Sequence, residues 1–188
     1  MRSKPTVLLV LLLFLSSTSA LASKDSLGYP QHTVFIELGG YGGFWSLNYD
    51  RVLWRKGIVS ITGRIGFGLP GIVFDNELNP SVAVPIGVNL LLGKKGMYFE
   101  FGLAQIPASI VRSSSKPDVP ERVAGISAGL SVGMRWHKPQ GGFFLSAHYT
   151  LLSQYYKDLQ HWAGIGIGYT FKYKNESTRA SPPGNSSF

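Results

Sequence analysis

The stretch ISAGLSVGMRW, residues 126–136, decides the fold class, because bulky apolar residues alternate with small or polar ones along its whole length. Side chains two residues apart lie on the same face of a β-strand, so strict alternation predicts a strand with two chemically different faces. One face carries Ile126, Ala128, Leu130, Val132, Met134 and Trp136, and the other carries Ser127, Gly129, Ser131, Gly133 and Arg135. The segment therefore predicts a β-strand with one uniformly apolar face.

Seven further segments alternate in the same way. They are residues 33–38, 45–50, 59–67, 82–90, 98–103, 143–151 and 162–171. Pro85 interrupts the fourth segment, and because proline cannot donate to a strand ladder we expect a β-bulge there. Beyond the N-terminal segment described below, no part of the chain has convincing helical spacing, so the sequence predicts an all-β fold of eight strands.

The connections between these segments alternate in length. Short links at 55–57, 93–96 and 137–141 are interleaved with longer ones at 68–81, 105–122 and 152–161. Short turns at one end and longer loops at the other are typical of an up-and-down antiparallel barrel that spans a membrane. The link at 39–43 departs from the rule, because it belongs to the loop end yet is short.

The N-terminus has the order of parts of a secretory signal peptide. Arg2 and Lys4 precede the apolar run 7–15, and Ala20 and Ala22 provide the small residues that a signal peptidase requires. We expect cleavage after Ala22, a short lead-in at 23–30, the barrel at 31–172 and a polar, disordered tail at 173–188. Nine apolar residues are too few to cross about 30 Å as a helix, which disfavours a membrane anchor.

Composition narrows the class further. Only 15% of residues are charged, while glycine (23) and aromatic residues (4 Trp, 9 Tyr, 11 Phe) are abundant. The absence of cysteine excludes disulfides, thiolate metal sites and a lipid anchor on an N-terminal cysteine. The net charge of +8 falls to +6 when the expected leader removes two basic residues and no acidic one. The basic residues are scattered and several lie in the expected tight turns, which favours a solvated surface near anionic lipid over nucleic-acid binding.

The apolar face must be buried or must contact lipid, and in lipid every backbone polar group needs an internal partner. An open sheet cannot meet that condition, so we expect a closed, eight-stranded antiparallel up-and-down transmembrane β-barrel. Six charged or titratable residues fall on the inward face and, because unpaired buried charge is costly, predict an interior polar network that plugs the lumen. They are Glu37, Asp50, Arg64, Glu100, Arg135 and His148. Five aromatic residues near the short-turn end predict an interfacial girdle, namely Trp54, Trp136, Phe143, Tyr169 and Phe171.

Four motifs carry a family resemblance. They are ELGG at 37–40, SLNYDR at 46–51, PIGVNLLLG at 85–93 and GIGYTF at 166–171. Together they resemble the small OmpA/OmpX-type barrels, within a largely uncharacterised group of outer-membrane barrels of gram-negative bacteria. The resemblance covers about residues 31–172 and implies an outer-membrane location and recognition of a terminal aromatic residue by the assembly machinery. Phe171 closes the last strand, whereas the chain itself ends at Phe188.

Two other functions remain open at this stage. His148 and Thr150 faintly resemble the His-x-Ser pair of outer-membrane lipid A deacylases, which would make the protein a lipid-modifying hydrolase. A soluble lipocalin-like carrier also has eight strands, but it would place its bulky apolar residues inside and its charged residues outside. The four histidines lack metal-ligand spacing, and no cofactor motif is present.

The sequence therefore predicts a non-enzymatic outer-membrane barrel of a gram-negative bacterium, serving envelope integrity or surface interaction. Expected partners are membrane lipids and lipopolysaccharide, the outer-membrane assembly machinery, and an external partner bound through loops 68–81 and 105–122. Catalytic, cofactor and metal residues are not expected.

Overall fold

The structure is a computed structural model that describes residues 30–70, 73–74, 77–78, 81–113, 120–154 and 158–172. The expected signal peptide and the tail at 173–188 lie outside the described residues. The main strands are β1 (Pro30–Gly39), β2 (Trp45–Lys56), β3 (Val59–Leu69), β6 (Val82–Ala83), β7 (Ile86–Lys94), β8 (Met97–Ser113), β9 (Pro120–His137), β10 (Gly142–Gln154) and β11 (Asp158–Lys172). A 3-10 turn, η2 (Gly40–Gly42), follows β1, and a small hairpin is formed by β4 (Val73–Phe74) and β5 (Glu77–Leu78).

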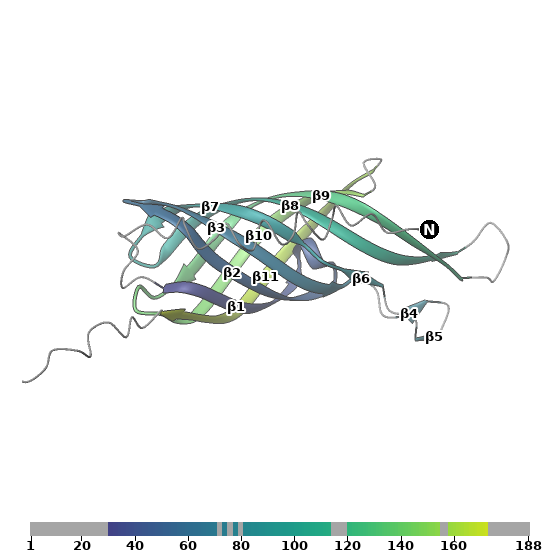
Figure 1. The fold of residues 1–188 in the computed structure, drawn as a ribbon, viewed down its shortest axis with the longest axis horizontal. Coiled ribbons are helices and arrows are strands. Elements are labelled where there is room, and N and C mark those ends of the chain that lie inside the picture. The colour runs from purple at the N-terminus through teal and green to yellow at the C-terminus, as the bar shows by residue number, and fades with distance from the viewer. Residues whose placement is uncertain are drawn as a thin grey trace, which may run out of the picture.

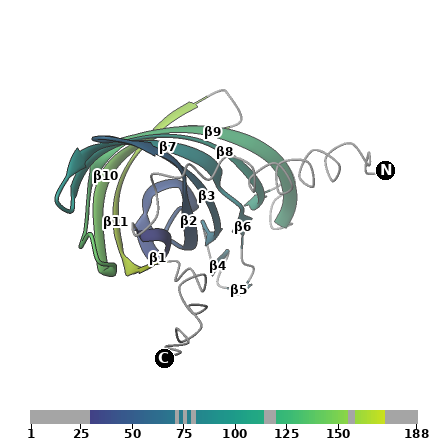
Figure 2. The same ribbon diagram turned by 60° about the vertical axis from the view of Figure 1, so that its left-hand side comes forward.

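The strands close into a barrel. Every consecutive pair is antiparallel, with β6 and β7 together forming the fourth strand, and β11 returns to pair with β1. Figures 1 and 2 show the strands running obliquely around a common axis, with β1 and β11 adjacent. The fold class is therefore confirmed as a closed, eight-stranded, all-antiparallel β-barrel. Among the described residues, no helix is long and apolar enough to cross a membrane.

The two faces of each strand are those that the alternation predicts. On β1, Ile36 and Leu38 are 53% and 62% exposed, whereas Phe35 and Glu37, which alternate with them, are 2% and 0% exposed. The same contrast recurs around the barrel, as on β8, where Phe99 and Phe101 face outward and Tyr98 and Glu100 face inward. The outer surface is thus apolar and the charged side chains are enclosed, which excludes the inverted arrangement of a lipocalin-like carrier.

A β-bulge in β2 sets the direction of its last side chains. The register with β3 shifts between Val52, which pairs with Thr62, and Trp54, which pairs with Ile61. Strict alternation from the inward Asp50 would have placed Trp54 inside the barrel. Because the bulge adds one residue to β2, Trp54 shares the outer face with Ile61 instead.

Pro85 interrupts the fourth strand without shifting its register, so the expected bulge is wrong. Gly68 pairs with Ala83 and Ile65 pairs with Ile86, which leaves three steps on both strands. The amide of Gly66 donates to the Pro85 carbonyl at 2.8 Å, so the residue still accepts a ladder bond although it cannot donate one. Pro85 therefore removes one backbone hydrogen-bond donor from the sheet but does not add an extra residue to the strand.

Two of the loop-end connections are shorter than the sequence predicts. Strands β8 and β9 pair continuously from Met97–Trp136 to Ser113–Pro120, so most of the expected loop at 105–122 is a projecting β-hairpin, visible in Figure 1. The expected loop at 152–161 is likewise mostly strand, because Gln154 pairs with Asp158. The prediction failed because polar residues beyond the apolar band weaken the alternation without ending the ladder.

Candidate functional site

The interior of the barrel contains the candidate site, and its half nearest the short turns is filled by charged groups. Arg64 on β3 forms an ion pair with Glu37 on β1, and its Nε and Nη2 also donate to Asn48 Oδ1 at 3.1 and 2.9 Å. Ser46 Oγ donates to Glu37 Oε2 at 3.3 Å. On the other side of this carboxylate, His148 Nε2 lies 2.9 Å from Oε1. Glu37 on β1 therefore contacts side chains of three other strands, β2, β3 and β10.

A second cluster is centred on Arg135 of β9. Its Nε and Nη2 donate to the two oxygens of Glu100 at 2.8 and 2.7 Å, and Nη2 also donates to Asp50 Oδ2 at 3.2 Å. Asp50 Oδ2 accepts further hydrogen bonds from Thr62 Oγ1 at 2.8 Å and Asn89 Nδ2 at 3.0 Å. The arginine thus binds one carboxylate through two parallel bonds and a second carboxylate through one.

The six predicted network residues are therefore all brought together inside the barrel. None is more than 8% exposed, so their charges are removed from water and depend on each other for stabilisation. Aromatic rings complete the packing, with the Arg64 guanidinium 4.9 Å from the Phe35 ring centre and that of Arg135 5.5 Å from the Phe144 ring centre. Side chains, ion pairs and rings together occupy this half of the interior.

Glycines on the inner wall make room for the network. A Cβ added at Gly102 would lie 2.7 Å from both Asn89 Oδ1 and Tyr41 Oη, and one added at Gly164 would overlap the His148 ring. In both places the added Cβ would lie closer to its neighbours than van der Waals contact allows. The inward glycines of the alternating segments therefore leave the space that the neighbouring interior side chains occupy.

The other half of the interior, toward the loop end, is filled by apolar groups. Turn η2 folds inward rather than over the rim, and Tyr41 at its centre is only 2% exposed. Its ring packs with Ala83, Ala104 and Ile106, and its hydroxyl donates to Ser131 Oγ at 2.8 Å. Arg64 lies 5.2 Å below the Tyr41 ring centre, so Tyr41 forms the boundary between the two halves.

A small cavity lies on the loop side of Tyr41. Its volume is about 70 Å³. It is lined by Tyr41, Gly43, Pro70, Ala83, Ile106, Ala108, Ser127, Leu152, Gln160 and Trp162. Most of this lining is apolar, in contrast to the charged groups beneath it.

The predicted girdle residues lie on the outer face. Trp136 and Phe143 are neighbours with ring centres 6.1 Å apart, and Tyr169 and Phe171 are neighbours at 4.9 Å. Trp54 is 37% exposed beyond the β2 bulge. All five come from the ends of strands that adjoin the short turns or the chain termini.

Sequence reasoning missed Tyr41, which the structure places at the centre of the interior. The glycine-rich link 39–43 indicated only a short connection. Gly39, Gly40 and Gly43 all have positive φ, at 76°, 72° and 84°, which residues with a Cβ rarely adopt. A lone aromatic residue among such glycines, in a link too short to reach outward, is the signal that could have identified it.

A closed eight-stranded barrel with an apolar exterior and an ion-paired interior has the architecture of the small outer-membrane barrels. The N-terminal β-barrel domain of OprF from Pseudomonas aeruginosa has a TM-score of 0.51 and 16% identity, over 75% of this chain and 98% of that one. The attachment invasion locus protein Ail of Yersinia pestis has a TM-score of 0.51 and 13% identity, over 76% of this chain and 99% of that one.

These likenesses establish the fold, which is that of a small OmpA/OmpX-type barrel. No protein-family model matches the sequence. No curated protein matches it either.

Proposed function

We propose that the protein is a non-enzymatic barrel of the gram-negative outer membrane, exported by its signal peptide, with a lumen plugged by its own side chains. The observation that carries this proposal is the contrast between the faces of one strand. On β9, Leu130 and Val132 are 57% and 46% exposed, while Arg135 on the inner face is 3% exposed and fully ion-paired. In water such an exterior is unfavourable, whereas in a bilayer it is required.

The two ways in which the interior is filled support the proposed plug. The ion-paired half and Tyr41 with its apolar neighbours lie in series along the barrel axis, so an ion would have to displace both. We therefore propose a structural barrel that contributes to envelope integrity or presents its loop end to an external partner. The projecting β8–β9 hairpin and segment 68–81 are the surfaces proposed for that contact.

The hydrolase alternative is disfavoured by where its residues lie. His148 is 8% exposed and Thr150 0% exposed, both on the inner face. His148 approaches Glu37 rather than a hydroxyl group. A lipid in the bilayer would meet only the opposite face of β10, which leaves this pair without access to its substrate.

Membrane fractionation with a heat-modifiability gel tests the proposal. We expect the full chain in the outer-membrane fraction and faster migration before boiling, because a closed barrel resists unfolding by detergent. A soluble periplasmic protein with heat-independent migration would overturn the proposal. Lipid hydrolysis by the purified protein that is lost in His148→Ala would instead establish the enzyme.

A further inference from the structure

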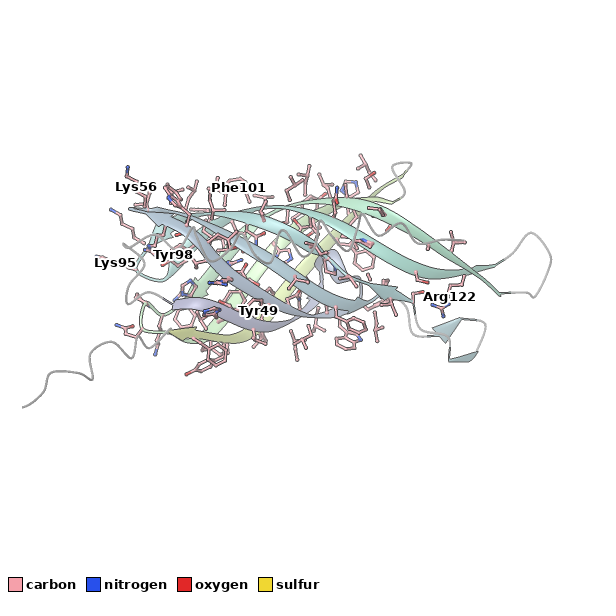
Figure 3. The ribbon with its side chains drawn as sticks, in the orientation of Figure 1. Tyr49, Lys56, Lys95, Tyr98, Phe101 and Arg122 are labelled. Carbon is pink, nitrogen blue, oxygen red and sulfur yellow. The ribbon has the colours of Figure 1, made fainter. Side chains whose placement is uncertain are left out.

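The two ends of the barrel differ in charge. Five basic residues lie on the outer surface toward the short-turn end. Four of them are at strand ends or in turns, and Arg51 lies within β2, paired with His32 near the beginning of β1. The five are Arg51, Lys56, Lys94, Lys95 and Lys138. The described carboxylates nearest this end, Asp50 and Glu100, are buried inside and already paired with Arg135. Figure 3 shows Lys56 and Lys95 at one end of the barrel and Arg122 toward the other.

The opposite end has no such excess. The three sequence segments that join strands there, 68–81, 105–122 and 152–161, contain five acidic and four basic residues. The acidic ones are Asp75, Glu77, Asp118, Glu121 and Asp158, and the basic ones are Arg112, Lys116, Arg122 and Lys157. The basic character is therefore a property of the turn end rather than of the whole surface.

Strand register places these cations at the level of the aromatic girdle. Arg51 pairs with His32, and His32 pairs with Phe171, so the three form one row across β2, β1 and β11. A second row runs from Lys94 through Met97 to Trp136 across β7, β8 and β9. Each row contains one strong cation and one girdle aromatic on the lipid-facing surface.

Lys56 extends the same arrangement. It lies two residues beyond Trp54, and the β2 bulge places both on the outer face. Aromatic rings of membrane proteins lie at the level of the lipid head groups, and long basic side chains reach from that level to the phosphates. The girdle therefore fixes the depth at which these ammonium and guanidinium groups lie.

We propose that the turn end binds the anionic head groups of phospholipids in the adjacent leaflet through Arg51, Lys56, Lys94, Lys95 and Lys138. This inference rests on the proposed membrane location. Phosphatidylglycerol is the simplest lipid of this chemistry, because its phosphate is not neutralised by a cation in its own head group. Selective binding would also favour insertion with the turns facing an anionic leaflet.

Quenching of tryptophan fluorescence by lipids with brominated acyl chains tests the proposal. The full chain with Trp45→Phe and Trp162→Phe retains only Trp54 and Trp136, both in the girdle at the turn end. In mixed bilayers we expect brominated phosphatidylglycerol to bind about fivefold or more strongly than brominated phosphatidylcholine. About 0.5 M salt should reduce this preference, because it screens the head-group charge.

Two charge variants show which end of the barrel produces the preference for phosphatidylglycerol. In the Trp54/Trp136 background, replacing all five basic residues of the turn end by glutamine should reduce the preference to about one. Replacing Arg112, Lys116, Arg122 and Lys157 by glutamine at the loop end should leave it unchanged. Heat-modifiability of each variant shows that the barrel still closes, and the salt dependence of the parent protein tests the proposal without any charge variant.

Equal quenching by both lipids, or a preference abolished by the loop-end variant, would overturn the proposal while leaving the membrane barrel intact. Absence of quenching by either lipid, together with heat-independent migration, would overturn the membrane location itself. The two failures are therefore distinguishable.

Discussion

The two halves of the barrel interior follow the same strand geometry but are filled in opposite ways. Toward the turns, Arg64 and Arg135 pair with three carboxylates, and His148 approaches one of these carboxylates, Glu37. Toward the loops, Tyr41 packs with alanines and one isoleucine. The alternation of side chains determines which residues enter the barrel, but the filling of each layer depends on what the opposite strands supply. One half is therefore held by mutual charge compensation and the other by close packing.

The two modes of filling predict different responses to mutation. Removing one member of a buried ion pair leaves its partner charged in a medium that solvates it poorly. Removing an apolar side chain leaves a cavity, whose cost scales with the volume lost.

Replacement of Arg135 by methionine should have the largest effect. It leaves Asp50 and Glu100 without their shared cation, and a broken buried pair of this kind costs about 3–5 kcal/mol. Urea unfolding of the lipid-reconstituted barrel measures the loss. The triple variant Asp50→Asn, Glu100→Gln, Arg135→Met should recover most of the stability, because it removes all three charges together.

Failure of that recovery would show that Arg135 acts through its packing against Phe144 rather than through charge. Arg122→Met at the exposed loop end is the matched control. We expect it to change stability by less than about 0.5 kcal/mol.

Tyr41→Ala should have the next largest effect. The ring is almost fully buried, and truncating a buried aromatic residue to alanine costs about 3 kcal/mol. The variant also removes the boundary between the two halves, so the cavity on the loop side should extend to Arg64. Single-channel recordings should still show the lumen closed by the ion-paired half. An open channel in Tyr41→Ala would show that the charged half does not occlude the lumen by itself.

Glu37→Gln should destabilise the barrel by about 2 kcal/mol. The amide keeps the shape of the side chain and can still accept from Arg64, but it no longer compensates the charge of Arg64. Urea unfolding of the lipid-reconstituted barrel measures the loss, and an unchanged stability would show that the Glu37–Arg64 ion pair contributes no net stabilisation.

Tyr41→Phe should have the smallest effect, about 1 kcal/mol, because it removes only the hydrogen bond to Ser131 and keeps the ring. Ser131→Ala should produce a similar loss, and the double variant should lose little more than either single one. Additive losses would show that the two hydroxyl groups do not act as a pair.

Much of this interior could be predicted from the sequence. The inward positions of Glu37, Arg64 and Arg135 follow from alternation alone, and the expectation that buried charges pair follows from the cost of burial. The choice of partners could not be predicted, because it depends on how the strands are staggered around the barrel. Only the closed structure shows that Arg135 lies between Glu100 on a neighbouring strand and Asp50 across the lumen.

Three features had no sufficient signal in the alternation. The bulge in β2 between Val52 and Trp54 exchanges the inward and outward positions of the residues that follow it. Nothing in residues 50–56 of the sequence indicates where the extra residue is accommodated. The β8–β9 hairpin continues past the apolar band, where polar residues resemble a loop. Tyr41 enters the lumen because the surrounding glycines permit positive φ, a property that strand periodicity does not report.

The central claim is that one face of each strand contacts lipid while the other is enclosed. The chain has no cysteine, so single cysteines can be introduced at each position from 128 to 134, spin-labelled, and tested for collision with oxygen and with a water-soluble nickel complex. The account predicts oxygen accessibility with a period of two, highest at Leu130, Val132 and Met134, and low accessibility to both reagents at Ser131 and Gly133. High accessibility of the nickel complex at Leu130 and Val132 would place that face in water and contradict the account.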